Sequence, residues 1–97
     1  MSFVQIIEFR TSKLADMEAV GEQWEKATEG KRKARRRLLC QDLDQPDRYF
    51  NLVFFDNYEE AMENSKMPET TELSQKMMGF ADGPATFYNL DVLDDRL

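Results

Sequence analysis

The amino-acid sequence predicts a single α+β domain whose elements follow the order β-α-β-β-α-β. Three observations predict it: the chain has 97 residues, two segments show helical spacing of apolar residues, and three segments are rich in β-branched and aromatic residues, with residues 34–43 as a further candidate strand. Hydrophobic residues make up 41% of the chain and charged residues 33%, which is typical of a globular domain and excludes a disordered chain. We therefore expect residues 1–97 to form one domain.

The first half of the chain predicts a strand, a helix and a second strand. Residues 3–9 are β-branched and aromatic, which favours a strand. Thr11 or Ser12 is a candidate helix cap, because a hydroxyl accepts a hydrogen bond from a free N–H of the first turn. Apolar residues then follow at helical spacing until Gly30, a residue typical of a helix end. Residues 34–43 predict the second strand.

The second half repeats the same plan. Residues 48–55 predict a strand that is apolar on both faces. Asn57 is a candidate helix cap with Glu60 three residues later, which is the spacing of a capping box. Pro68 interrupts this helix and suits the first turn of another. Residues 86–92 predict the last strand.

This order is the ferredoxin-like βαββαβ arrangement, an antiparallel four-stranded sheet with its helices on one face. The opposite face of the sheet has no helix to cover it, although the third strand offers apolar residues to both faces. An exposed apolar sheet is unfavourable, so we expect a partner. The simplest partner is a second copy related by a two-fold axis, with the two sheets stacked into a dimeric α+β barrel.

The charge distribution argues against nucleic acid as a partner. The net charge is −6, yet six basic residues lie within residues 31–37. Such a run can bind phosphates, but the rest of the chain is strongly acidic and no aromatic residues are interleaved with the run. We interpret these residues as pairing with acidic residues of the same chain or of a second copy.

Several function classes are excluded by residues that the chain lacks. It has no histidine, which removes Ser-His-Asp and Cys-His catalysis and histidine-ligated metals. Cys40 is the only cysteine, so there is no internal disulfide and no cysteine-based zinc site. Asp42, Asp44 and Asp47 lie near a turn but do not match a calcium-binding loop, so we expect no metal. No segment reads as a membrane span or signal peptide, and we expect a cytoplasmic protein.

Four segments carry a resemblance to a known family: residues 3–9, residues 46–53, residues 58–69 and residues 82–87. They resemble the antibiotic biosynthesis monooxygenase-like proteins of the dimeric α+β barrel superfamily, over the chain from Phe3 to about Val92. The resemblance implies a homodimer and, for the oxygenases of that family, chemistry without a cofactor on a hydroxylated aromatic substrate. The haem-degrading branch of the superfamily is not implied, because it relies on a histidine ligand. We therefore expect no cofactor.

Alternation along the strands predicts which residues face a cavity between the two sheets of the dimer. We place the wholly apolar set of the third strand, Phe50, Leu52 and Phe54, under the helices, and Trp24 in the helical core. The same rule places Val4, Ile6, Tyr88, Leu90 and Val92 under the helices and leaves Phe3, Phe9 and Phe55 on the opposite face. If residues 44–47 form a tight turn, Leu38 and Cys40 lie opposite Val53 and Asn51. The candidate ligand-binding residues are those of the opposite set, together with their expected neighbours: Gln5, Ile7, Arg36, Leu38, Asn51, Val53, Phe87 and Asn89. Such apolar walls with a few polar groups are typical of a small-molecule site. The three amides could instead hydrogen-bond one another or water.

Three functions follow as hypotheses. The first is an enzyme acting on a small hydrophobic or aromatic, polyketide-like compound, by cofactor-independent monooxygenation or by isomerisation, with Gln5 and Asn51 orienting the substrate. The second is a non-catalytic ligand-binding dimer with the same cavity. The third is a structural homodimer whose cavity is filled by its own side chains. The sequence identifies no catalytic residue.

Overall fold

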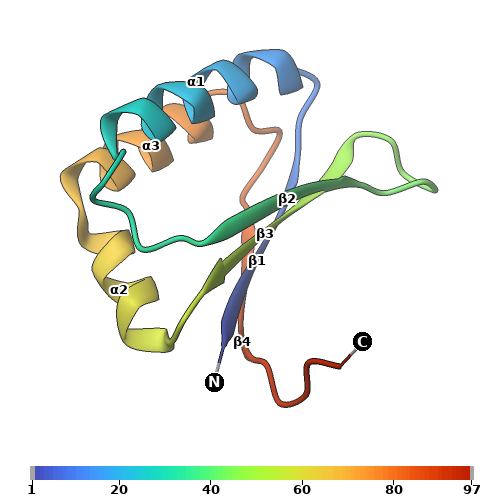
Figure 1. Cartoon of the computed structure of the whole chain (residues 1–97). Coiled ribbons are helices and arrows are strands. Elements are labelled where there is room, and N and C mark those ends of the chain that lie inside the picture. The colour runs from blue at the N-terminus through green and yellow to red at the C-terminus, as the bar shows by residue number, and fades with distance from the viewer. Residues whose placement is uncertain (1, 97) are drawn as a thin grey trace.

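The structure is a computed structural model that describes residues 2–96, and it confirms the predicted order of elements. Figure 1 shows three helices lying over a four-stranded sheet formed by these residues. The elements are β1 (Phe3–Arg10), α1 (Leu14–Ala27), β2 (Arg36–Gln41), β3 (Arg48–Phe55), α2 (Tyr58–Lys66), α3 (Pro68–Met78) and β4 (Thr86–Asp91).

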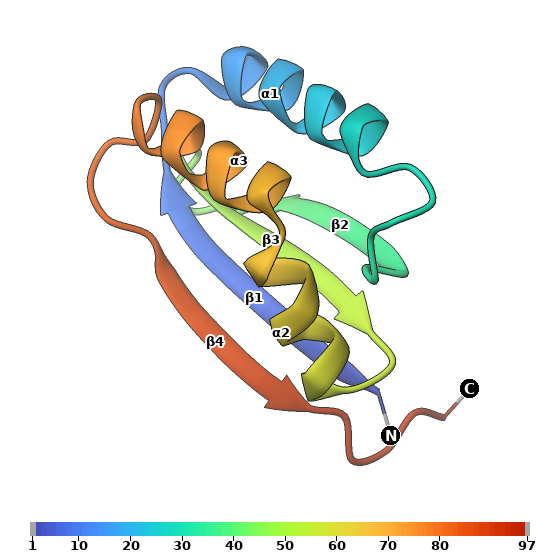
Figure 2. The same cartoon turned by 90° about the vertical axis from the view of Figure 1, so that its left-hand side faces the viewer.

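The sheet is antiparallel, and its strands lie in the order β2-β3-β1-β4. All three helices cover the same face of it, which Figure 2 shows with the helices in front of the strands. The helix α1 lies beside α3, and α2 lies over the other end of the sheet. This is the predicted ferredoxin-like α+β fold. Within residues 2–96, no helix has the length and apolar character needed to cross a bilayer.

The sequence signals differ in how well they place the element ends. The strand β3 begins and ends where predicted, and the Asn57 side chain accepts a hydrogen bond from the Glu60 N–H at 2.8 Å, which confirms the predicted cap. The cap predicted for α1 is wrong, because no side chain caps that helix. The Thr11 hydroxyl accepts instead from the Lys13 N–H at 2.9 Å and donates to the Phe80 carbonyl at 2.6 Å, so it ties two loops together.

The predicted assignment of the two sheet faces is inverted in the structure. Phe3 and Phe9 of β1 and Phe55 of β3 are buried on the helix side, although the sequence placed them on the opposite face. The side chains predicted under the helices alternate with these and lie on the outer face of the sheet: Val4, Ile6, Phe50, Leu52, Phe54, Tyr88 and Leu90. The physical reason is that both faces of β1 and β3 are apolar, so alternation identifies two sets without saying which set the helices cover.

The register of β2 also differs from the prediction by one residue. The sequence placed Leu38 and Cys40 beside Val53 and Asn51, whereas Leu38 pairs with Leu52 and Cys40 with Phe50. The connection between β2 and β3 spans residues 42–47 and is longer than the tight turn that the prediction assumed. Leu38 therefore lies on the outer face, and its neighbours Arg37 and Leu39 lie on the helix side.

The core beneath the helices is divided into two clusters at opposite ends of the sheet. One contains the buried side chains Phe3, Phe55 and Ala61. The other contains Phe9, Met17 and Tyr49, with the Phe9 and Tyr49 rings stacked at 5.6 Å. The middle of the same face carries the amides of Gln5 and Asn51 beside Ile7 and Val53, and a cavity lies over them.

Candidate functional site

A cavity of about 610 Å3 lies between the helices and the middle of the sheet, inside a single protomer. This position differs from the predicted one, which was between the sheets of two protomers. Its floor is formed by neighbouring residues of the central strands and β4: Gln5, Ile7, Asn51, Val53, Phe55 and Phe87. The volume falls within the range of small-molecule sites, which is roughly 300–1,000 Å3.

The helices supply the roof of the cavity. Trp24 of α1 is half-buried there, and its indole N–H donates to the Thr70 hydroxyl of α3 at 3.1 Å, which fixes the plane of the ring. Gly21, one turn before Trp24, has no side chain, and a Cβ placed there would lie 3.9 Å from the Met77 side chain. The roof therefore presents one oriented aromatic ring, with apolar side chains such as Leu73 and Met77 and hydroxyl groups such as that of Ser74 beside it.

Two hydrogen-bonded groups place the polar atoms of the floor. Gln5 and Asn89 are direct partners across β1 and β4, and the Gln5 amide N–H donates to the Asn89 side-chain oxygen at 3.1 Å. The Arg37 Nε–H donates to the Asn51 side-chain oxygen at 3.0 Å, while its Nη2–H donates to the Glu18 carboxylate of α1 at the same distance. Arg37 thus spans the gap between the sheet and α1 at the β2 side of the cavity.

Basic side chains follow the same side of the cavity. Arg32, in the connection between α1 and β2, lies over the Trp24 ring with its guanidinium carbon 5.9 Å from the ring centre. It donates to the Glu25 carbonyl at 2.7 Å. The full cavity lining contains four arginines and one glutamate: Arg32, Arg35, Arg36, Arg37 and Glu25. The lining therefore has the opposite charge balance to the acidic chain as a whole.

The sequence predicts that the basic residues within 31–37 pair with acidic residues. The structure confirms this for three of them. Lys31 contacts Glu69, Arg35 contacts Asp56, and Arg37 contacts Glu18. Lys31 also lowers the pKa of the Glu69 carboxyl, because its ammonium donates a hydrogen bond to the ionised form.

Most of the predicted candidates line the cavity, although the prediction placed it on the wrong side of the sheet. Six of them contribute to the lining: Gln5, Ile7, Arg36, Asn51, Val53 and Phe87. Asn89 is held against Gln5. Leu38 is turned to the opposite face, and Arg36, which pairs with Phe54 on that same outer face, borders the cavity from the edge of the sheet. The sequence analysis missed Trp24, Arg32 and Arg37, which it assigned to the core or to a solvated run. One signal in the sequence could have located the cavity under the helices. On one face of β1, the polar residue Gln5 lies between the aromatic residues Phe3 and Phe9.

The outer face of the sheet carries rows of apolar side chains and has no cover within the protomer. Its central row across the four strands is Leu38, Leu52, Ile6 and Tyr88, and the next row contains Phe54, Val4 and Leu90. Tyr88 is 42% exposed and Leu90 44% exposed. An apolar surface of this kind is typical of a protein–protein interface.

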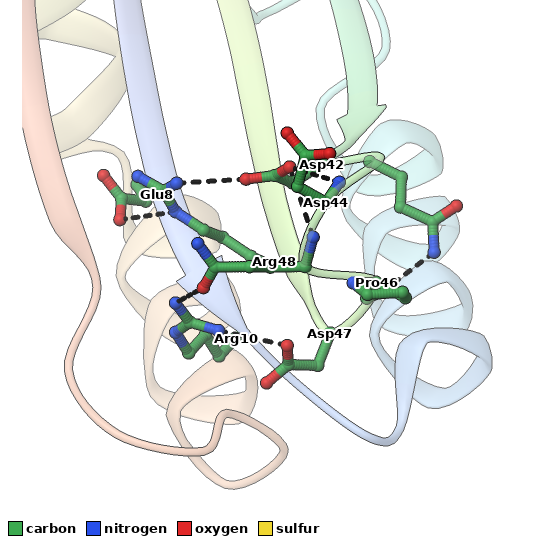
Figure 3. A network of polar contacts seen from close by, with 9 residues as sticks. Glu8, Arg10, Asp42, Asp44, Pro46, Asp47 and Arg48 are labelled. Atoms are coloured by element: carbon green, nitrogen blue, oxygen red, sulfur yellow. Dashed lines mark hydrogen bonds and ion pairs between the residues drawn. The ribbon is translucent and has the colours of Figure 1, made fainter.

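A network of charged residues closes one end of this outer face. Figure 3 shows Arg48 between Glu8 and Asp42, and its guanidinium donates to each carboxylate at 3.0 Å. The hydrogen bond from Arg48, and then that from the Tyr88 hydroxyl, lowers the pKa of the Glu8 carboxyl. The hydrogen bond that the Asp44 backbone N–H donates to the Asp42 carboxylate is the main reason why the pKa of Asp42 is lowered. The hydrogen bond from the Tyr88 hydroxyl to Glu8 raises the pKa of Tyr88.

The side chains around the cavity do not form a metal site. Within the part of the chain that the structure describes, no three histidine, cysteine, aspartate or glutamate residues gather closely enough to hold an ion. The polar groups of the cavity are amides, hydroxyls and guanidiniums, which bind and orient organic anions and carbonyl groups more readily than they bind metals.

Comparison with protein-family profiles and with curated proteins found no match for this sequence. Comparison with solved structures found many of the same fold. The cofactor-independent oxygenase SnoaB from Streptomyces nogalater matches with a TM-score of 0.81 at 9% identity, over 97% of this chain and 95% of SnoaB. The protein Rv0793 from Mycobacterium tuberculosis matches with a TM-score of 0.78 at 14% identity, over 98% of each chain. A protein from Caulobacter crescentus CB15, provisionally named an antibiotic biosynthesis monooxygenase, matches with a TM-score of 0.81 at 11% identity, over 96% of this chain and 91% of its own.

These matches confirm at the level of fold the resemblance found in the sequence. The chain has the ferredoxin-like α+β fold of the antibiotic biosynthesis monooxygenase-like proteins, and the similarity covers nearly the whole chain.

Proposed function

We propose that this chain is a homodimeric small-molecule enzyme that oxidises an aromatic, polyketide-like compound in the cavity beneath its helices, without a cofactor. The observation that carries the proposal is the cavity itself, a space of about 610 Å3 bordered by apolar side chains such as Ile7 and Phe87 and by polar groups that hydrogen bonds orient. The fold shared with a protein described as a cofactor-independent oxygenase supports the reaction class.

The composition of the cavity favours a reaction that draws on the acidity of the substrate. Among the described residues of the lining, Glu25 is the one carboxylate, and it is exposed at the rim. Guanidinium and amide N–H groups at Arg37, Arg32 and Gln5 would stabilise the anion that forms when a phenol or an anthrone loses a proton. In such a substrate a methylene carbon becomes a carbonyl: one oxygen atom of O2 enters the product, and the other leaves as water with the two hydrogens.

A second candidate function is ligand binding without turnover. It is favoured by the hydrogen bonds that the cavity side chains already make among themselves, Gln5 to Asn89 and Asn51 to Arg37. Groups that are satisfied in this way orient a ligand but are less available for proton transfer.

We propose further that two protomers associate through the outer faces of their sheets. The uncovered apolar rows around Leu52 and Ile6 support this arrangement, because burying them removes apolar surface from water. It leaves one cavity in each protomer. We also propose a cytoplasmic location, in which the exposed thiol of Cys40 stays reduced.

The test is oxygen uptake with a hydroxylated anthrone, compared with its spontaneous oxidation. We expect faster formation of the quinone with one O2 consumed per quinone formed. The variant Gly21→Leu extends a side chain into the cavity and is expected to abolish the acceleration, whereas Gly21→Ala, whose Cβ meets Met77 at an ordinary contact distance, retains it.

Three outcomes separate the candidate functions. Acceleration that Gly21→Leu removes supports the enzyme. Binding of the anthrone by calorimetry without acceleration refutes the oxygenase and favours the second candidate. An absence of both refutes any small-molecule role for the cavity.

A further inference from the structure

The arginines at the β2 side of the cavity define the charge of its ligand. We propose that the cavity selects an anionic aromatic compound, with a carboxylate held between Arg32 and Arg37 and a ring lying against Trp24. This inference rests on the proposed small-molecule function and adds the substrate class to it. It does not require that the ligand be oxidised.

The first support is the reversal of charge at the cavity. The whole chain has 13 basic and 19 acidic residues, but the lining has four arginines and one glutamate. Arg35 and Arg37 are paired with the carboxylates of Asp56 and Glu18 beside the lining, so Arg32 and Arg36 supply its excess of positive charge. A concave surface with low-dielectric walls and one sign of charge concentrates ions of the opposite sign. A cavity bordered by arginines in an acidic protein is therefore suited to an anionic ligand.

The second support is the geometry of Arg37. Its Nε–H and one Nη2–H are used by Asn51 and Glu18, which hold the guanidinium in one orientation between the sheet and α1. An arginine has five N–H donors, and within residues 2–96 the Nη1 group of Arg37 makes no hydrogen bond to the protein. A fixed guanidinium with unused donors in a cavity matches the two oxygens of a carboxylate.

The third support is the pairing of charge with an aromatic surface. Arg32 lies over the Trp24 ring and makes no ion pair with a carboxylate of the described chain, and the ring is fixed by its bond to Thr70. Figure 2 shows the connection that carries Arg32 on the β2 side of the sheet, away from β4. A planar ligand on this side of the cavity would therefore contact the fixed ring of Trp24 and the guanidiniums of Arg32 and Arg37. Apolar side chains such as Ile7 line the cavity beyond them.

The test compares two ligands of the same shape, 2-naphthoate and 2-naphthamide, by calorimetry. We expect the carboxylate to bind at least about tenfold more tightly than the amide at low salt, because charge-assisted hydrogen bonds are about twice as strong as neutral ones. Added salt is expected to weaken binding of the carboxylate and not of the amide. Trp24 is the only tryptophan, so a change in intrinsic fluorescence shows that the ligand binds beside it. Trp24 also borders a smaller pocket between α1 and α3, and loss of the signal in Arg37→Gln assigns the ligand to the cavity over the sheet, which Arg37 borders and the smaller pocket does not reach.

Charge-changing variants locate the selectivity. In Arg37→Gln and in Arg32→Gln the preference for the carboxylate is expected to fall to about twofold or less, with the amide affinity unchanged, while Arg37→Lys retains part of it. Lys13→Gln makes the same change of charge at an exposed position just before α1 and is expected to leave the preference intact. An unchanged melting temperature of Arg37→Lys and Arg32→Gln shows that the fold is preserved.

The outcomes distinguish this inference from the function it rests on. Equal affinity for the two ligands in the unmodified protein overturns the anion selectivity and leaves the small-molecule function standing. A preference that survives in both arginine-to-glutamine variants also overturns it. Binding of neither ligand overturns the inference, whereas the small-molecule function itself is decided by the anthrone experiment.

Discussion

The two faces of the sheet are both built from alternating apolar residues, but they differ in where the polar groups lie. On the helix side, large aromatic residues such as Phe3 and Phe9 stand at the two ends, and the amides Gln5 and Asn51 occupy the middle. On the outer side, the middle rows are apolar and the charged network around Arg48 closes one end. The first pattern leaves a cavity under a roof, whereas the second leaves a flat apolar surface with a polar border.

This difference indicates that the two faces serve different purposes. Polar groups in the centre of a face contribute less packing energy than apolar ones, but they can orient a ligand. A face that is apolar in its centre and polar at its edge has the anatomy of a protein–protein interface. Substitutions on the two faces should therefore have separable effects on folding, association and ligand binding.

The largest expected effect is on folding, at an end of the helix-side face. Phe3 is 3% exposed and contacts Phe55 and Tyr58, so Phe3→Ala is expected to lower the free energy of unfolding by about 3–5 kcal/mol. Val53→Ala, at the cavity floor, should cost about 1 kcal/mol, because its side chain already borders open space. Urea denaturation at one fixed protein concentration measures both. Equal losses for the two variants would contradict the division of this face into packed ends and an open middle.

The next effect is on association through the outer face. Leu52→Lys places a charge in the central apolar row and is expected to raise the dimer dissociation constant at least about 100-fold, because an unpaired charge in a buried interface costs roughly 3 kcal/mol. Sedimentation velocity across a dilution series measures it. Glu59→Lys on the exposed side of α2 is the control and should remain dimeric. A monomeric parent protein at micromolar concentration would show that this face is not the interface.

A smaller effect is the response of the charged network to acid. The pKa values of Glu8 and Asp42 are lowered in the folded chain, so their ionised forms stabilise it fully above their unfolded values of about 4.5 and 3.8. That contribution is lost as the pH falls below these values toward the folded ones. We expect the melting temperature to fall between pH 5 and pH 3 less steeply in Arg48→Gln than in the parent. The control Lys13→Gln should keep the parent's slope, and an unchanged slope in Arg48→Gln would contradict the assignment.

The smallest effect on stability is expected at the middle of the helix-side face. Replacing Gln5 and Asn89 together by leucine removes both partners of one hydrogen bond at the edge of an open cavity. The free energy of unfolding should change by less than about 1 kcal/mol, since no polar group is left without its partner. Calorimetric melting measures this. A loss as large as that of Phe3→Ala would show that the amide pair is part of the core instead of the site.

The sequence predicted the order of the elements well because those signals are local. The bounds of β3, the Asn57 cap and the break at Pro68 depend on residues within a few positions of one another. The faces of the sheet depend on which apolar set the distant helices cover, and that choice is not encoded in alternation. Most candidate residues of the site were found because alternation groups Gln5, Ile7, Asn51 and Val53 on one face of the sheet, whichever face that is. Arg37 was missed because its role depends on the register of β2, which a longer connection shifted by one residue.

The division between α2 and α3 at Met67 and Pro68 has a consequence for the size of the cavity. The two helices differ in direction, as Figure 2 shows, and each covers a different part of the sheet. Asn64 and Ser65 of α2 and Thr70 and Ser74 of α3 all border the cavity, on either side of this bend. A change of backbone angles at Met67 and Pro68 would therefore widen or narrow the chamber while the strands stay unchanged.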